Sequence, residues 1–115
     1  MPCVHEFGVI DVLDKQANFQ EYNPDKYNCI SVHDDIIETL VDRLTSMKTY
    51  FHSLGRPEFG LAYYGITIIP PESLSFFYEV VSASSDFKKS EELAELAAKI
   101  IQGSEERKYM IHYGV

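Results

Sequence analysis

The sequence predicts one α+β domain: a small mixed β-sheet of about four strands, with three helices packed mainly on one face. The chain has 115 residues, of which 45% are hydrophobic, and this is enough to build one core over residues 1–115. Short runs rich in β-branched and aromatic residues are interspersed with segments whose apolar residues recur every three or four positions. Taken in order along the chain, these segments predict the elements β-β-α-β-α-α-β with short connections.

The N-terminal segment predicts a strand followed by a long loop. Residues 3–13 are rich in valine, isoleucine and phenylalanine around Gly8, which indicates a strand with a bulge or a close backbone approach at the glycine. Residues 14–28 are polar and contain Asn-Pro-Asp turn chemistry. We expect this loop to lie pinned across the surface by its rings, Phe19, Tyr22 and Tyr27.

A second strand and the first helix follow. Residues 28–32 predict a short buried strand that runs directly into a helix, with Asp35 as its cap and Glu38 completing a capping box. Apolar residues then recur at threes and fours as far as Leu54, and Gly55 with a nearby proline marks the stop. The pattern therefore predicts one long helix from Asp35 to Leu54.

The middle of the chain predicts a central strand and a second helix. Residues 60–69 end in a run that is apolar on both faces, which is typical of a strand inside a sheet. Two prolines and a glutamate then open a helix that reaches about Ala83. Phe76 falls off the apolar stripe and is free to meet the loop or a partner; the stripe itself is Leu74, Phe77, Val80 and Val81.

The C-terminal part predicts a third helix and a last strand. Ser90 caps a helix that Gly103 ends. Residues 108–113 alternate in the manner of a strand. The helix stripe is Leu93, Leu96, Ala97, Ile100 and Ile101. Four tyrosines are expected to line the sheet, namely Tyr63, Tyr64, Tyr109 and Tyr113.

The charge distribution favours binding over catalysis. The net charge is −8, and residues 1–42 hold nine acidic side chains against Lys15 and Lys26. Such a field repels nucleic-acid phosphates and anionic membranes and attracts basic partners. Solubility alone is the alternative explanation. The leading hypothesis is an acidic protein-binding module of inhibitor or immunity type that docks a basic protein; its expected contacts are Asp34, Asp35, Glu38 and Asp42, with Tyr22 and Tyr27 as anchors.

The sequence lacks the patterns of membrane segments, signal peptides and nucleotide-binding loops, and we base our expectations about compartment and cofactors on this. No window is apolar for long enough to span a membrane, and Glu6 and Asp11 interrupt the place of a signal peptide. We therefore expect a soluble, cytoplasmic protein. The six glycines form no phosphate-binding motif, so the sequence implies no nucleotide, flavin or other cofactor.

Histidines offer an alternative function of a different class. His5, His33 and His112 all lie at or near predicted strands, where neighbouring carboxylates could complete a metal or acid–base site. The alternative is thus a small metal-dependent or acid–base enzyme. A third possibility is a homodimer joined through exposed aromatics such as Phe76.

Three segments carry a resemblance over nearly the whole chain: YNCISVHDD at 27–35, GLAYYGITIIPPESL at 60–74 and KYMIHYGV at 108–115. They resemble a group of small uncharacterised bacterial proteins with the same layout. The resemblance implies a stand-alone bacterial cytoplasmic protein and transfers no catalytic residue. In its small size and acidity, the chain is also similar to immunity proteins that neutralise toxic nucleases, which is an analogy of character.

Overall fold

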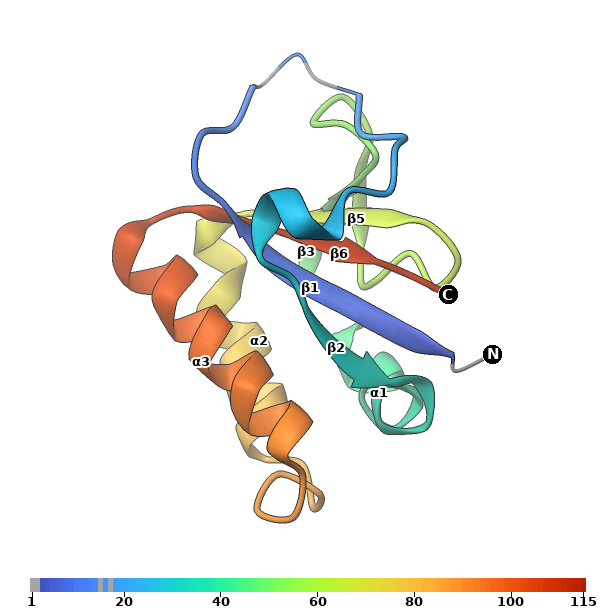
Figure 1. Ribbon diagram of the computed structural model, residues 1–115, viewed down its shortest axis with the longest axis vertical. Coiled ribbons are helices and arrows are strands. Elements are labelled where there is room, and N and C mark those ends of the chain that lie inside the picture. Colours follow the sequence, from blue (N-terminus) through green and yellow to red (C-terminus); the bar gives the residue numbers. More distant parts are fainter. Residues whose placement is uncertain (1–2, 15, 17) are drawn as a thin grey trace.

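Six strands form a single antiparallel sheet in the computed structural model, which describes residues 3–14, 16 and 18–115 (Figure 1). The order across the sheet is β2-β1-β6-β5-β3-β4, so the first and last long strands, β1 and β6, lie side by side near its middle. The strands are β1 (Val4–Ile10), β2 (Ile30–His33), β3 (Lys48–Phe51), β4 (Pro57–Phe59), β5 (Ile66–Ile69) and β6 (Tyr109–Tyr113).

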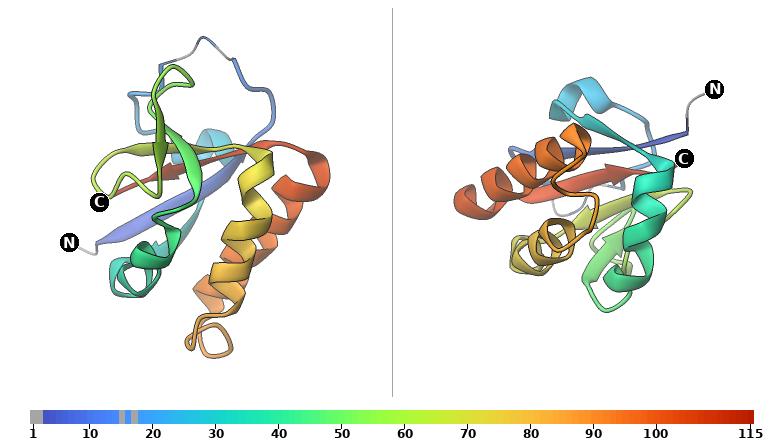
Figure 2. Two further views of the ribbon diagram at one scale, coloured as in Figure 1. Left: turned by 180° about the vertical axis from the view of Figure 1, so that it is seen from behind. Right: turned by 90° about the horizontal axis from the view of Figure 1, so that it is seen from below.

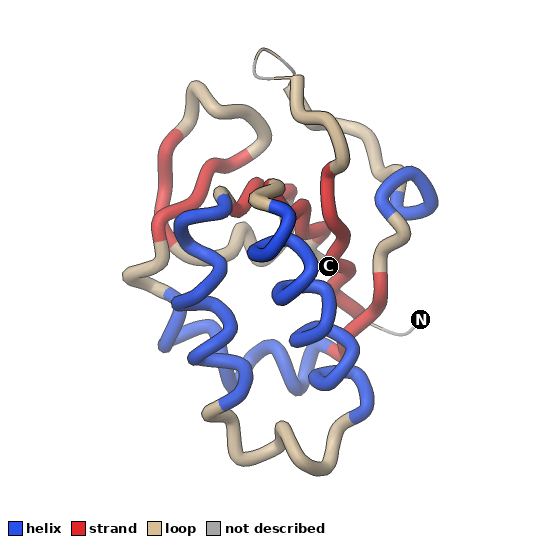
Figure 3. Tube along the Cα trace, turned by 90° about the vertical axis from the view of Figure 1, so that its left-hand side faces the viewer, coloured by secondary structure: helices blue, strands red, loops and turns tan. Residues whose placement is uncertain are grey.

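Three helices cover one face of this sheet, which we call the helix face (Figure 3). They are α1 (Asp34–Val41), α2 (Leu74–Ser82) and α3 (Glu91–Glu106). Alternate strand residues such as Phe7, Ile69 and Met110 point toward them, since neighbours along a strand face opposite sides. The helices contribute Ile37, Leu40, Leu74, Phe77, Val80, Val81, Leu93, Leu96, Ala97 and Ile100 to the same core.

The other side of the sheet, the loop face, is covered by the segment between β1 and β2. A short 3-10 helix, η1 (Pro24–Tyr27), lies on this side, opposite α2 and α3 (Figure 2). Phe19 and Tyr27 pack there against a second cluster of sheet residues, as the pinned loop predicts. A Cβ on Gly8 would lie 2.6 Å from the carbonyl oxygen of Tyr27, so the close approach predicted at this glycine is confirmed. Residues 15 and 17 of the predicted loop lie outside the described residues.

The predicted fold class is right in outline and wrong in two details. The domain is α+β with three helices, but the sheet has six strands instead of about four, and every observed strand pair is antiparallel instead of mixed. Both added strands come from the segment predicted to be the second half of the first helix and the turn after it. Helix α1 ends at Val41, a 3-10 turn continues to Leu44, and β3 and β4 follow.

Pairing with the sheet overrides the helical spacing after Leu44. Thr49, Tyr50 and Phe51 are β-branched or aromatic, and such side chains fit a pleated surface. The Thr49 hydroxyl donates to the carbonyl of Gly60 at 2.7 Å, while Tyr50 packs on the loop face. Apolar residues that fit a helical stripe thus fit alternating faces of a strand equally well.

The remaining elements follow their predictions in outline. The strand predicted at residues 60–69 is shorter, because the chain turns at residues 63–64 before β5 begins. Ile101, predicted in the apolar stripe of α3, is 40% exposed, because it lies about 100° around the helix from the buried Ile100.

All four predicted core residues of α2 are buried, whereas Phe76 is half-buried and packs against the helix-face core. The Ser90 hydroxyl accepts from the Leu93 amide at 3.2 Å, which confirms the predicted cap of α3. Helix α3 runs past Gly103 to Glu106, because the glycine packs against Leu74 of α2 within the helix. No helix in the described part of the chain has the length and apolar content to cross a membrane.

Candidate functional site

Two histidines lie buried next to each other on the helix face. His5 is on β1 and His112 on the neighbouring β6, and neither has measurable exposure. Their rings stack with centroids 5.1 Å apart. Thr67 of β5 is directly opposite His112 in the strand register, so three adjacent strands bring three polar side chains into one row.

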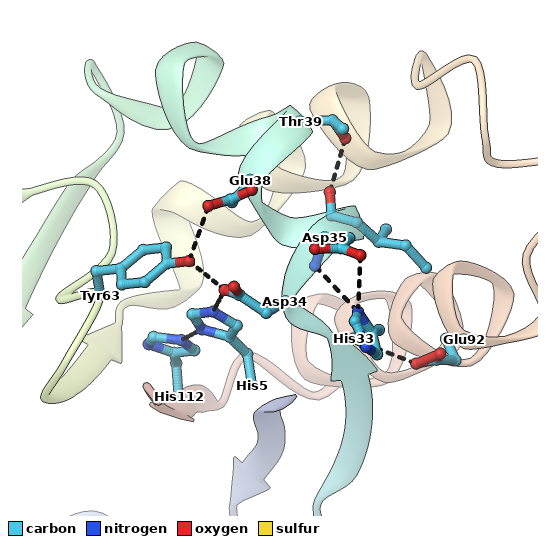
Figure 4. Close-up of polar contacts among 10 residues, drawn as sticks. His5, His33, Asp34, Asp35, Glu38, Thr39, Tyr63, Glu92 and His112 are labelled. Atoms are coloured by element: carbon cyan, nitrogen blue, oxygen red, sulfur yellow. Dashed lines mark hydrogen bonds and ion pairs between the residues drawn. The ribbon is translucent and has the colours of Figure 1, made fainter. Parts of the chain in front are cut away.

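These side chains form a continuous hydrogen-bonded chain with Asp34, and Figure 4 shows its His112, His5 and Asp34 members. His5 Nδ1 lies 2.8 Å from His112 Nε2, and His112 Nδ1 lies 3.0 Å from the Thr67 hydroxyl. At the other end, His5 Nε2 lies 2.9 Å from Oδ1 of Asp34, the first residue of α1. The Thr67 oxygen also accepts from the backbone amide of Ala62 at 2.8 Å. Every ring nitrogen of the pair therefore has a partner.

The ionised Asp34 carboxylate fixes the first proton of this chain. An ionised carboxylate only accepts, so His5 Nε2 carries a proton and donates it. The chain then continues from His5 Nδ1 to His112 Nε2 and from His112 Nδ1 to the Thr67 hydroxyl. It thus connects one charge at the surface to two buried rings and a hydroxyl on β5.

The turn that carries Asp34 is positioned by β2. The strand leads directly into α1, and the Asp34 amide donates to the Cys3 carbonyl at 2.9 Å. His33 is the N-cap: its Nδ1 accepts from the Asp35 amide at 3.1 Å. The cap lies two residues before the position predicted from sequence, and Asp34 and Asp35 occupy the first turn, where the helix dipole favours negative charge.

The site places an ionised carboxylate, Asp34, at the surface and a neutral imidazole, His112, in the interior. Hydrogen bonds from Tyr63 and then from His5 hold the pKa of Asp34 below its usual range. The carboxylate of Asp34 in turn raises the pKa of the Tyr63 hydroxyl, which therefore stays protonated. Burial, followed by the proximity of His5, lowers the pKa of His112 well below its ordinary value, so His112 is neutral at physiological pH.

Three carboxylates gather at this point, and we call them the acidic turn: Asp34, Asp35 and Glu38. Oxygen atoms of all three lie within 4.8 Å of one another. Asp35 is 84% exposed, whereas Asp34, which faces His5, is 18% exposed. Among the described residues, the only ion pairs of these groups are with histidines, and none is with a lysine or an arginine. The acidic turn is thus an anionic focus without a compensating fixed cation.

A pair of tyrosines borders the acidic turn. The Tyr63 hydroxyl donates to Asp34 and is 3.3 Å from Oε1 of Glu38. The ring of Tyr63 meets that of Tyr64 edge to face, with centroids 4.9 Å apart, and Tyr64 is 82% exposed. The expectation that these two tyrosines line the sheet is wrong, because both lie in the turn before β5. Tyr109 and Tyr113 do lie on a strand, β6.

The other expected contact residues lie apart from the acidic turn. Asp42 is exposed at the far end of α1. Tyr27 is half-buried and packs on the loop face, so it serves the core. Tyr22 is 62% exposed; its ring meets Tyr113 edge to face and its hydroxyl donates to Glu6. The fold therefore brings together three of the six residues that the sequence suggested for partner binding.

The three histidines of the alternative site are only partly brought together. His5 and His112 meet, while His33 caps α1 and has no contact with their chain. The ring nitrogens of the buried pair are all engaged in hydrogen bonds, which leaves no lone pair directed at an ion. The oxygen atoms of the acidic turn are the ligands that hard cations such as Mg²⁺ and Ca²⁺ take.

Sequence reasoning missed the two residues that complete the buried chain, Tyr63 and Thr67. Each is ordinary in its local context, and its role depends on which strands are neighbours. The available signal was the Tyr-Tyr-Gly sequence at 63–65, since a glycine after two rings is compatible with a turn that exposes them.

The chain was compared with protein-family models, with curated proteins and with solved structures, and none of the three comparisons gives a match.

Proposed function

We propose that this chain is a protein-binding module of the inhibitor or immunity type, which docks a basic protein partner through the acidic turn. The observation that carries the proposal is the gathering of three carboxylates within 4.8 Å, with no lysine or arginine paired to them among the described residues. Like charges at this spacing repel one another, and a cationic group from a partner relieves the repulsion.

The surroundings of the acidic turn favour a protein partner. Asp35 and Glu38 are exposed on a short helix, while Tyr63 and Tyr64 stand beside them. Tyrosine is enriched at interfaces because its ring is buried while its hydroxyl keeps a hydrogen bond. Charge complementarity raises the association rate, and the aromatic pair supplies apolar contact area.

The buried histidine chain supports the same function because it holds the acidic turn in position. Two fully buried imidazole rings give α1 a polar attachment to the sheet through Asp34. A buried network in which every polar group is satisfied favours one arrangement over others. A rigid acidic turn loses little conformational entropy on binding, which is how preorganisation raises affinity.

The test is capture of partners on the immobilised chain from a lysate of the source cell, with elution by a salt gradient. A double variant, Asp35→Lys with Glu38→Lys, replaces two of the three carboxylates of the acidic turn with cations and leaves Asp34, His5 and His112 in place. The matched control, Glu95→Lys with Glu105→Lys, makes the same change of total charge on exposed positions of α3. The proposal predicts a basic protein that is captured by the wild type and the control and lost from the acidic-turn variant.

Two results would count against the proposal. If both double variants lose the captured protein equally, net charge is responsible and the acidic turn has no special part. If addition of Mg²⁺ or Ca²⁺ alone stabilises the wild type but not the acidic-turn variant, the carboxylates serve a metal ion instead.

A second function, acid–base chemistry, is favoured by one specific observation. The hydrogen-bonded chain leads from the surface carboxylate Asp34 to two imidazoles, which is the kind of connection that moves protons. His5→Gln would then abolish an activity, found with a panel of activated esters and phosphodiesters, while the chain remains folded. An activity that survives this change, or a panel without turnover, removes this candidate.

A further inference from the structure

A small aromatic hollow lies on the surface beyond the tyrosine pair. It has a volume of about 210 Å³ and is lined by Tyr22, Tyr64, Tyr113 and His52, together with the chain around Gly65 and Gly114. Tyr64 belongs both to this hollow and to the pair that borders the acidic turn. The hollow therefore adjoins the surface assigned above to a basic partner.

We propose that this aromatic hollow receives a lysine or arginine side chain of the basic partner, held over the tyrosine rings while the acidic turn binds neighbouring positive charge. This inference rests on the proposed function, and it names the group that the partner inserts. The face of an aromatic ring attracts a cation within about 6 Å of its centre. Two exposed rings from different segments, Tyr22 and Tyr64, line this hollow.

The geometry of the rings fits this role. Tyr22 stands edge to face on Tyr113, with centroids 5.1 Å apart, and Tyr64 stands in the same way on Tyr63. Each exposed ring is thus supported by a second one instead of lying free on the surface. The volume is below the roughly 300 to 1,000 Å³ of sites for drug-sized ligands, and it suits the end of one side chain.

The charge around the hollow selects for a cation. The Tyr22 hydroxyl donates to the carboxylate of Glu6, which lies on β1 beside this rim. Burial, and after it the carboxylate of Asp25, raises the pKa of Glu6, so a second acidic group lies near this rim. No lysine or arginine is among the described residues that line the hollow. Nδ1 of His52 forms a hydrogen bond with the carbonyl oxygen of Phe19, at 2.9 Å.

The experiment is an NMR titration of the full chain with defined single-residue probes. N-acetyl-lysine amide and N-acetyl-arginine amide supply the cation, and N-acetyl-norleucine amide is the neutral comparison. The expected result is a saturable shift of the Tyr22 and Tyr64 ring signals with both cationic probes, and binding of norleucine that is about fivefold weaker. Equal binding of the neutral probe, or no saturable shift with either cation, overturns the inference.

Two substitutions at Tyr64 distinguish the effect of the aromatic ring from the effect of apolar contact area. Tyr64 is largely exposed, so neither change threatens folding. Tyr64→Phe keeps the ring and is expected to bind the cationic probes as the wild type does. Tyr64→Leu keeps an apolar side chain without the ring and is expected to weaken binding of the cationic probes about fivefold. If the leucine variant binds as well as the phenylalanine variant, the rings do not hold the cation.

The probe titration needs no partner protein, so its outcome is independent of the capture experiment. In the acidic-turn variant the hollow is intact, and the cationic probes still shift its ring signals. If these shifts vanish with the acidic turn, the cation binds the carboxylates and not the rings. A hollow that binds cations in a chain that captures no basic protein would contradict the proposed function while leaving the hollow in place.

Discussion

The burial of His112 predicts that the protein loses stability in mildly acidic solution. In the unfolded chain this histidine takes up a proton near its ordinary pKa of 6.5, whereas in the folded state burial keeps its pKa well below that value. The stabilising contribution is therefore complete above pH 6.5 and is lost progressively as the pH falls toward the folded-state pKa. The sign is fixed because the unfolded chain binds the additional proton.

The size of this loss in stability depends on how far the pH falls below 6.5. Each pH unit below 6.5 costs up to about 1.4 kcal/mol for one proton. Between pH 7.5 and pH 5 the loss from this residue alone can therefore reach, and cannot exceed, about 2 kcal/mol. For a domain whose whole stability is about 5 to 15 kcal/mol, such a change is readily measured.

The assay is urea unfolding followed by circular dichroism, at pH 7.5, 6 and 5, for the wild type and for His112→Gln. The glutamine variant is expected to be less stable at pH 7.5 by about 1–3 kcal/mol, because partners in the buried chain are left unpaired. It should, however, lose less stability than the wild type between pH 7.5 and pH 5, by up to about 2 kcal/mol. Equal losses in the two proteins would refute the reasoning, since another group would then be the one that titrates.

Three further predictions concern single contacts. Thr67→Val should lower the free energy of unfolding by about 1–3 kcal/mol in urea titrations, because it leaves Nδ1 of the buried His112 without a partner; unchanged stability would show that a water replaces the hydroxyl. Gly8→Ala should lower the thermal midpoint, at a cost of about 1–3 kcal/mol, because its Cβ would overlap a backbone carbonyl of the loop segment, and a neutral effect would mean that this segment moves away. Tyr63→Phe should raise the pKa of Asp34, measured by carbon NMR, because the first of its stabilising hydrogen bonds is removed; an unchanged value would assign the shift to the histidine.

The parts of the fold that local sequence could predict are those in which one periodicity dominates. Helix α3 has a serine cap and a stripe of residues such as Leu93 and Leu96, and the structure follows both. The segment after Leu44 fits two periods, because Met47, Phe51 and Leu54 recur at helical spacing whereas Thr49 and Tyr50 fit opposite faces of a strand. Only the pairing of β3 with β5 decides between them, and this pairing depends on residues far along the chain.

The candidate site shows the same limit more clearly. The acidic residues of α1 could be identified from the sequence because they are local, but the cap of the helix lies two residues earlier than predicted, at His33 and not at Asp35. The contact between His5 and His112 joins residues 107 positions apart, and it exists because β1 and β6 are neighbours in the sheet. Strand order is not encoded in a local pattern, so neither the buried chain nor the part played by Tyr63 could be predicted.

The most direct test of the proposed docking role is the affinity of the captured basic protein for three purified chains at low and at moderate salt. The chains are the wild type, the Asp35→Lys, Glu38→Lys variant and the Glu95→Lys, Glu105→Lys control. The account predicts tight binding to the wild type that weakens as salt increases, a near-equal affinity for the control, and a large loss for the acidic-turn variant. Affinities that are the same for both double variants, or that do not change with salt, would contradict it.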